Sequence, residues 1–432
     1  MPEQPSLQRE SLFRNKRYLF LIAAQGISNL GDWLYILALF IEVGVRWHSS
    51  PTVISIMMLS LSGPIILFGP LAGVLADRFN RTLLMIISNL VMALLIAMIP
   101  LLPARWEVFV ILIGVGTFQA LFSPAEQAKL KEVVPDALMH QAVSTSSSIT
   151  QLTKIIGPGL SGLLVAALGT MSAYYLDSVS FLISTVLLLF TGFRSQQRDT
   201  EEPGTPVIKE TFLQRMRVGW AHIAKNRMLW LGTSLITIIM LLIQLTDSQF
   251  VTLFRLLPSM SVNLFGYVMA SSGIGALLVA LVISKFEWKS AMLAMAVGAL
   301  TLGIGFAGEA LLVHYAVNQW LLELGALIVG AGASLVFIPF QTIAQRNTPA
   351  ELSGRVFGVI GSMTTAASLL GPVAGALVIT AFGPILGFLV TGLGLIALGI
   401  TTTVLKNWIE PRRAHVSEGN RGIQESAETH NY

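Results

Sequence analysis

The chain has 432 residues, of which 54% are hydrophobic and only 12% charged, and its mean hydropathy is +0.72. A soluble domain is about 25% charged, so much of this apolar surface is expected to face lipid. The absence of cysteine excludes disulfides, thiolate metal sites and thiol catalysis. The net charge of +4 comes from Lys and Arg at the ends of apolar segments, which argues against a nucleic-acid partner.

Twelve apolar segments are long enough to cross a bilayer, which requires about 20 mostly apolar residues. Backbone polar groups in lipid must be satisfied within the segment, so we expect helices. The predicted fold class is an all-α integral membrane protein with twelve transmembrane helices in two pseudo-symmetric six-helix halves. The expected spans are 18–43, 52–74, 83–103, 107–128, 140–168, 172–193, 229–254, 263–284, 290–313, 319–343, 353–381 and 384–406.

The positions of Lys and Arg predict the orientation. With the N-terminus in the cytoplasm, only Arg46, Arg105 and Arg255 of the 27 basic residues fall on the outer side, and Lys154 falls within the membrane. This asymmetry follows the positive-inside rule, so both termini are expected in the cytoplasm of a bacterial inner membrane. The predicted parts are a cytoplasmic N-terminus 1–17, a six-helix bundle 18–193, a cytoplasmic linker 194–228, a second bundle 229–406 and a disordered tail 407–432.

Span one carries Asp32 near the middle of the membrane, with Gln25 two turns earlier. A charge at that depth costs about 2.5–3.5 kcal/mol on insertion scales, so such residues usually pair or face a wet cavity. Asp32 is therefore a candidate for proton coupling or substrate binding, and Gln25 for substrate binding.

The loop after span two reads Gly73-Val74-Leu75-Ala76-Asp77-Arg78-Phe79-Asn80-Arg81 and resembles the signature loop of the major facilitator superfamily. Asn80 stands where glycine is usual, and because Asn tolerates the left-handed conformation we expect the tight turn to persist. Gly73 is expected to permit close helix approach, and Arg78 and Arg81 to pair with carboxylates or lipid phosphates. The resemblance implies a gating loop in which Asp77 meets the start of the eleventh span. The alternative is a charged loop that only fixes topology.

Spans four and five supply further polar candidates. Gln119 is the only strongly polar residue in the middle of span four, which lacks the Arg found there in many proton-coupled drug antiporters. Span five carries Gln151 and Lys154, and Lys154 is expected to pair with Asp32. We hypothesise that Asp32 exchanges protons and that the Lys154 ammonium adjusts the pKa of its carboxyl group. The alternative is a permanent structural ion pair between the two residues.

A Gly-Pro motif in span five recurs in span eleven, which indicates an internal duplication. Proline frees a backbone carbonyl and bends the helix, and the small residues allow another helix to approach closely. The first copy resembles the antiporter motif of drug exporters, and with span one it resembles the macrolide-efflux and enterobactin-exporter branch. The helix-bend residues are Gly157, Pro158, Gly159, Gly162, Gly371, Pro372 and Gly375.

The linker and the second half add two features. Leu213, Met216, Trp220 and Ile223 recur at helical spacing, which predicts an amphipathic helix on the cytoplasmic leaflet or a solvated linker helix. In span seven, Asp247 with Gln244 one turn earlier is the second candidate site. Other acids in the outer parts of spans are expected at the interface or an outer vestibule: Asp177, Glu309 and Glu323.

These residues predict an apolar cavity with sparse polar groups, suited to an amphipathic small molecule. Its expected lining is Gln25, Asp32, Gln119, Gln151, Lys154, Gln244, Phe337 and Met363. The predicted function is proton-coupled export of a drug-like, macrolide-like or siderophore-like compound by a monomer in contact with membrane lipids. No enzyme activity, cofactor or metal is expected, because no nucleotide-binding or catalytic motif is present. The alternatives are a lipid flippase or importer on the same fold, and a membrane scaffold or sensor that does not transport.

Overall fold

The computed structural model describes residues 12–135, 138–193, 212–258, 262–283, 290–315, 318–349 and 352–409. Within these residues the fold is entirely helical, with twelve helices long and apolar enough to cross a membrane, as predicted. In the first half the helices are η1 (Leu12–Arg14), α1 (Lys16–Leu39), η2 (Phe40–Arg46), α2 (Pro51–Arg78), α3 (Arg81–Met98), η3 (Ile99–Leu101), α4 (Arg105–Val133), α5 (Met139–Leu168) and α6 (Thr170–Leu189). In the second half they are α7 (Phe212–Lys225), α8 (Arg227–Thr246), η5 (Asp247–Gln249), α9 (Phe250–Phe254), α10 (Val262–Ile283), α11 (Ala291–His314), α12 (Gln319–Arg346), α13 (Ser353–Phe382) and α14 (Pro384–Ile409).

The boundaries differ from the predicted ones where the helical geometry changes. Span one continues past α1 as the wider helical turns of η2, and span seven is divided into α8, η5 and α9. Helix α14 runs to Ile409, beyond the predicted end at 406, and the rest of the predicted tail, 410–432, lies outside the described residues. The predicted N-terminus from 1 to 11 and the first part of the linker, 194–211, also lie outside them.

The duplication is visible in the local structure of α5 and α13. Each has 30 residues, contains the proline of the Gly-Pro motif and continues through it. Each ends at a glycine with φ of +83°, Gly169 in one and Gly383 in the other. Glycine adopts this left-handed conformation without the steric penalty of a Cβ, so both helices stop at the same place in the repeat.

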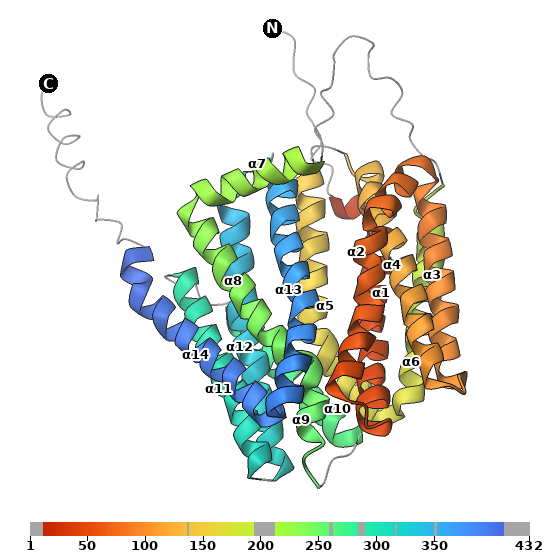
Figure 1. Ribbon diagram of the computed structural model, residues 1–432. Helices are drawn as coiled ribbons and strands as arrows, with labels where there is room; N and C mark the ends of the chain where they lie inside the picture. The colour runs from red at the N-terminus through yellow and green to blue at the C-terminus, as the bar shows by residue number, and fades with distance from the viewer. Residues whose placement is uncertain are drawn as a thin grey trace, which may run out of the picture.

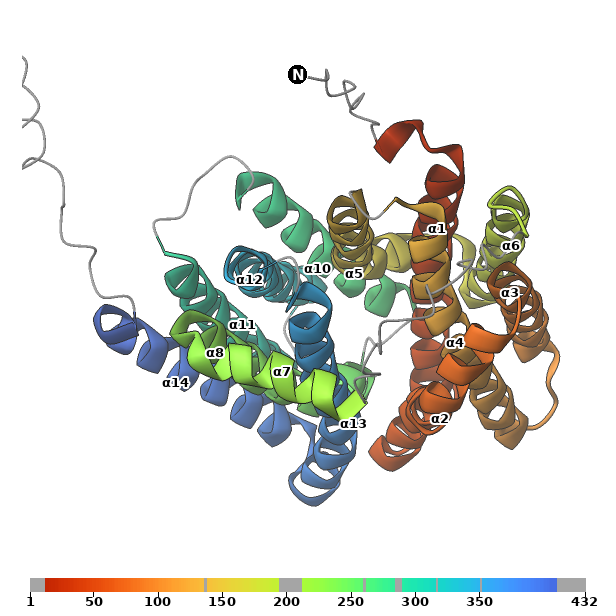
Figure 2. The same cartoon turned by 90° about the horizontal axis from the view of Figure 1, so that it is seen from above.

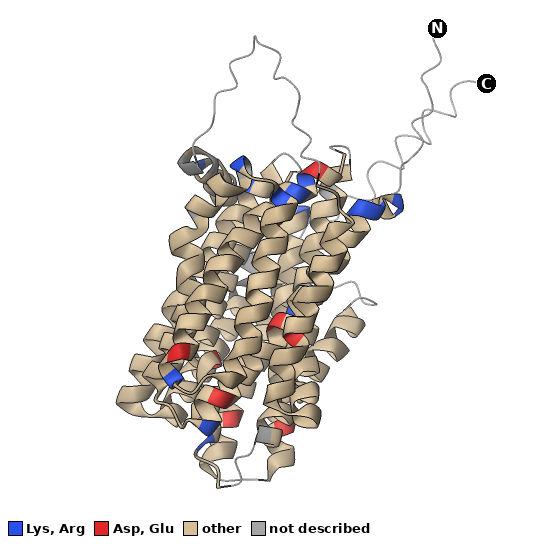
Figure 3. Ribbon diagram, turned by 90° about the vertical axis from the view of Figure 1, so that its right-hand side faces the viewer, with Lys and Arg blue, Asp and Glu red and all other residues tan. Residues whose placement is uncertain are grey.

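Two groups of helices form the molecule, one from α1–α6 and the other from α8–α14 (Figure 1). Contacts between the groups are made chiefly by α5 with α10 and by α2 with α13 (Figure 2). We call the end at which α1 begins and α7 lies the linker end, and the opposite end, with η2, η3 and α9, the far end. Lys and Arg gather at the linker end (Figure 3).

Helix α7 confirms the predicted helix in the linker and lies across the linker end of the second half (Figure 2). It packs on α13 so closely that a methyl group added at Gly219 would lie 2.5 Å from the Arg355 carbonyl oxygen. Ile223 is fully buried, whereas Trp220 is exposed and meets Trp230 of α8 edge to face at 5.7 Å. The helix is therefore anchored to the second half by packing.

Candidate transport site

A cavity of about 870 Å³ lies between the two halves. Its walls come mainly from α1, α5, α8, α10, α11, α12 and α13, with single residues from η2, η5 and α9, and most of its lining side chains are apolar. The lining extends to Ser147, Gln345 and Phe357, which lie near the linker ends of α5, α12 and α13. The cavity thus lies across the interface and approaches the linker end.

Two charged residues line this cavity among those that the structure describes, Lys154 of α5 and Asp247 at the start of η5. Both side chains are exposed, although both lie within membrane-spanning segments, so their exposure is to the cavity. They come from opposite halves. Neutral polar groups in the same lining include Gln244, Gln341 and Ser272.

The structure brings together some of the predicted lining residues and separates others. Lys154, Gln244 and Phe337 line the cavity, together with the second candidate Asp247. Asp32 is partly buried and Gln25 is buried against α5, where Ser146 Oγ donates to Gln25 Oε1 at 3.0 Å. The side chain of Gln151 is outside the described part of the structure. The predicted residues absent from the described lining are Gln25, Asp32, Gln119 and Met363.

The predicted Asp32–Lys154 ion pair is not formed. No ion pair within 4.0 Å joins these side chains, and Asp32 lies instead near Tyr35, Glu126 and Asp177. The neighbouring Trp33 does line the cavity, and its indole packs against Gly157 of α5. The prediction was wrong because equal membrane depth does not fix the direction in which a side chain leaves its helix.

Asp177 is a buried acid that the sequence placed in an outer vestibule. The structure buries it completely between α6 and α1, where Ser180 Oγ donates to its Oδ1 at 3.1 Å. Its Oδ2 has no hydrogen-bond partner. Gly31 makes room for this carboxyl group, since a side chain at position 31 would collide with Asp177 and Ser180.

Glu309 also corrects a sequence expectation. Instead of lying at the membrane–water interface, Glu309 is fully buried on α11. Neither of its carboxylate oxygens has a hydrogen-bond partner. Gly325 of α12 faces it, since a methyl group there would lie 2.7 Å from Glu309 Oε1. Glu323 is partly exposed.

The Gly-Pro segments allow close helix contacts to form. A methyl group at Gly159 would lie 2.7 Å from the Gly273 Cα of α10, and one at Gly162 would lie 2.7 Å from the Ala270 nitrogen. The second copy packs differently, because Gly371 and Gly375 lie against Gln244 and Leu245 of α8, in their own half. The glycines of the first copy therefore join the two halves, whereas those of the second copy pack within the C-terminal half.

At the far end, buried hydrogen bonds connect the halves. Ser55 Oγ of α2 donates to the Pro372 carbonyl of α13 at 2.7 Å. Gln249 Nε2 donates to the Pro51 carbonyl at 3.2 Å and to Ser55 Oγ at 3.4 Å, and its Oε1 accepts from Thr252 at 3.0 Å. We call Pro51, Ser55, Gln249, Thr252 and Pro372 the far-end latch. Sequence reasoning missed it, although a glutamine in an apolar span is a signal that could have identified Gln249.

At the linker end α2 and α13 are less closely packed. An added methyl group would meet no atom within 4 Å at Gly69 and Gly73 of α2, or at Gly354 and Gly358 of α13. The expected close approach of a helix at Gly73 is thus not made in this structure. The closed far end and the separated linker end describe a conformation that opens toward the linker end.

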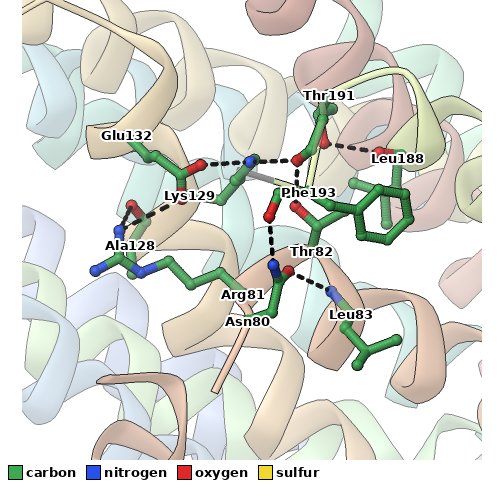
Figure 4. A network of polar contacts seen from close by, with 11 residues as sticks. Asn80, Arg81, Thr82, Leu83, Ala128, Lys129, Glu132, Leu188, Thr191 and Phe193 are labelled. Atoms are coloured by element: carbon green, nitrogen blue, oxygen red, sulfur yellow. Dashed lines mark hydrogen bonds and ion pairs between the residues drawn. The ribbon is translucent and has the colours of Figure 1, made fainter. Parts of the chain in front are cut away.

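The predicted gating loop belongs to a polar network within the first half (Figure 4). Arg81 lies 3.5 Å from Glu132 of α4, and Lys129 Nζ lies 2.7 Å from the same carboxylate. Lys129 and Thr82 also donate to the Gly192 carbonyl after α6, both within 3.0 Å. The network thereby fixes the linker ends of α3, α4 and α6 to one another. Arg78 is exposed, and the side chain of Asp77 is outside the described part.

Asn80 has a different role from the one expected. Its φ of −62° and ψ of 117° are extended rather than left-handed, and its side chain accepts from the Leu83 N–H at 3.1 Å. Asn80 therefore caps the start of α3, a position that favours Asn. Its Nδ2 also donates to the Phe193 carbonyl (Figure 4).

Replacing Lys129 by Met is expected to destabilise the first half by about 3–5 kcal/mol, because it leaves the Glu132 carboxylate buried with only the more distant Arg81. Lys129 is 2% exposed, and the Glu132 side chain is 7% exposed. Thermal unfolding in detergent would measure the loss. The control is Lys131→Met, an exposed lysine in the same helix, and equal stability of the two variants would contradict the prediction.

Comparison with known proteins gives the family. A family model of the Major Facilitator Superfamily matches residues 21–372, and the chain therefore belongs to this family. The chain is 37% identical over 417 residues to the "Uncharacterized MFS-type transporter YfiS" of Bacillus subtilis (strain 168), covering 96% of this chain and 99% of that protein. It is 25% identical over 408 residues to the "Multidrug efflux pump Tap" of Mycolicibacterium fortuitum, covering 90% and 95%.

A solved structure supports the same fold. An auto-inhibited peptide transporter of the POT family matches with a TM-score of 0.65 at 14% identity, covering 94% of this chain and 98% of that one. The protein is a multi-pass membrane transporter and not an enzyme, as the sequence predicted.

Proposed function

We propose that the protein exports a small amphipathic molecule across a bacterial inner membrane by proton-coupled alternating access. The observation that carries the proposal is the cavity of about 870 Å³ between two helical halves, which is apolar with a few polar side chains. Such a lining suits a ligand with a large apolar body. The similarity to Tap, described as a multidrug efflux pump, supports efflux of this kind of compound.

The proposed orientation places the linker end in the cytoplasm. The concentration of Lys and Arg there supports this orientation, because basic residues are retained on the cytoplasmic side (Figure 3). The cavity then opens inward, and export requires the linker end to close while the far-end latch opens. We expect the protein to work as a monomer in contact with membrane lipids.

Asp32 is the proposed proton carrier. A partly buried carboxyl group deep in the membrane is less costly when neutral, so proton release is linked to its access to water. Its neighbours Glu126 and Asp177 supply further carboxyl groups. The sequence led us to expect that Lys154 adjusts the pKa of Asp32. We assign Lys154 instead to the cavity wall, whose lining includes it.

A proton-flux assay tests the proposed function. Purified protein in liposomes with an interior pH dye would be exposed to macrolides, lipophilic cations and catecholate siderophores. Export by antiport predicts proton movement that begins only when a substrate is added. Binding without proton movement would contradict coupling to protons and indicate facilitated diffusion, lipid flipping or another coupling ion.

Lipid flipping is the second candidate, and one observation favours it. At the linker half of α2, Leu67 and Leu71 are 72% and 61% exposed. Apolar side chains beside the separated helices would allow an amphipath to enter from the inner leaflet. A fluorescent lysophospholipid, bleached from outside the liposomes, distinguishes the candidates, because only a flippase brings the inner pool to the bleaching reagent.

Cysteine cross-linking tests the alternating-access proposal, and the natural absence of cysteine makes the background clean. A Cβ at Gly44 of η2 would lie 2.9 Å from Val251 Cβ of α9, closer than the roughly 3.5–4.5 Å of a disulfide. A separation of the two segments by about 1 Å relieves this contact, so Gly44→Cys with Val251→Cys is expected to form a disulfide on oxidation. The cross-link should hold the far end closed and stop transport, with recovery on reduction. The pair Gly73→Cys and Gly354→Cys is the control and should not cross-link in this conformation. Full transport by the oxidised Gly44–Val251 pair would exclude opening at the far end.

A further inference from the structure

Two side chains of opposite charge line the cavity, one from each half of the molecule. Lys154 projects from the first half and Asp247 from the second, and both are exposed to the same cavity. Among the described residues, neither side chain makes an ion pair or a side-chain hydrogen bond. The site therefore offers one positive and one negative group that do not satisfy each other.

A further polar group without a partner lines the same cavity. On the second half, Gln341 of α12 lines the cavity nearer the linker end than Asp247, and its side-chain oxygen is buried and has no hydrogen-bond partner. An acceptor without a donor is costly in a desolvated site, so a ligand N–H group would satisfy it. The second half consequently provides two acceptors, a carboxylate and an amide oxygen, whereas the first half provides the Lys154 ammonium as a donor.

The opposite charges of Lys154 and Asp247 favour some classes of ligand over others. A lipophilic cation that approaches Asp247 would also encounter the positive field of Lys154, and an anion at Lys154 would encounter Asp247. When a ligand displaces water from an apolar cavity, any charge left unpaired loses its hydration without compensation. Only a ligand with both charges leaves neither residue unpaired, and its apolar body fits the remaining wall.

We propose that the transported molecule is an amphipathic zwitterion whose anionic group contacts Lys154 and whose cationic group contacts Asp247. This proposal rests on the proposed function and narrows its substrate class. Because the two contacts lie on opposite halves, the bound zwitterion connects the halves across the cavity. Binding thus favours their approach at the linker end, which the inward-open conformation requires for closure.

A matched ligand series tests the proposal with the full chain in nanodiscs. Ciprofloxacin is a zwitterion, its methyl ester is a cation, and its N-acetyl derivative is an anion, all with one apolar body. Lysophosphatidylethanolamine and lysophosphatidic acid form a second series that contrasts a zwitterionic and an anionic lipid. Titration calorimetry would give Kd for each ligand with the unmodified protein and with Lys154→Gln, Lys154→Arg, Asp247→Asn and Asp247→Glu.

The zwitterion of at least one series is expected to bind about tenfold or more tightly than its singly charged relatives. Lys154→Gln should remove the preference over the cation, and Asp247→Asn the preference over the anion. Lys154→Arg and Asp247→Glu should retain both, because the charges remain. Preference for the drug identifies a zwitterionic drug-like substrate, and preference for the lipid identifies a lysophospholipid; either supports the proposal.

Equal affinities within both series, or equal weakening of every ligand by Lys154→Gln, would overturn the zwitterion assignment. Proton-coupled export of neutral or singly charged compounds by Lys154→Gln at the original rate would also overturn it while leaving the proposed function intact. Conversely, charge-dependent zwitterion binding without proton flux supports the assignment and contradicts proton coupling. Failure to bind any ligand, including a lipophilic cation control, would overturn both.

Discussion

Replacing Asp32 by Asn is expected to reduce substrate-driven proton flux by at least about tenfold while leaving substrate binding unchanged. The amide has the shape of the protonated acid but cannot release a proton. Asp32 is not among the described residues that line the cavity, so the ligand should lose no contact. Proton flux in liposomes and Kd by calorimetry, measured on the same preparation, would separate these effects.

Two variants complete this experiment. Glu323→Gln changes a partly exposed acid elsewhere in the membrane-spanning region and should retain the original flux. Asp32→Glu keeps an ionisable group and should retain part of it. If Asp32→Asn transports protons at the original rate, Asp32 is not the carrier, and the nearby Asp177 and Glu126 become the candidates.

The second large effect is expected at Gly375 of α13. Its Cα lies so close to α8 that an added methyl group would be 2.6 Å from the Leu245 carbonyl carbon. The contact is with backbone, which cannot rotate away, so Gly375→Ala must separate the two helices. Overpacking of this kind costs about 1–3 kcal/mol or more. We expect a lower melting temperature in detergent and a lower yield of folded protein.

Gly358, in the same helix, provides the matched control. A methyl group there would meet no atom within 4 Å. Because alanine is favoured over glycine in a helix by about 1 kcal/mol, Gly358→Ala should match or exceed the original stability. Similar melting temperatures for the two variants would contradict the inference that the second Gly-Pro copy stabilises the C-terminal half through backbone contact.

The sequence predicted the helical elements because their cause is local. Long apolar runs form helices in lipid, whatever their neighbours, since each backbone group must be paired within its own segment. The paired motifs of α5 and α13 revealed the duplication, and the structure repeats their shared length and terminal glycine. The helix in the linker was predictable for the same reason, from apolar residues at helical spacing.

The candidate site was predicted less completely. Lys154, Gln244 and Asp247 do line the cavity, because polar side chains deep in an apolar span usually avoid lipid. The depth of a polar residue in the membrane did not predict which other polar residue it contacts. Asp32 lies with other acids instead of with Lys154, and Glu309 is enclosed between α11 and α12. The far-end latch of Ser55 and Gln249 depends on two helices from different halves, and no local pattern encodes their contact.

By itself, the sequence therefore determined the class of protein, the twelve spans, the duplicated halves and the residue types available for a transport site. Only the tertiary structure decided which side of each helix faces the cavity, the other helices or lipid. The physical reason is that lipid is as apolar as a protein core, so a membrane helix lacks the contrast between apolar and polar faces that shows orientation in a soluble helix. The unpaired charges of Lys154 and Asp247, on opposite walls of one cavity, became visible only when the two halves were placed together.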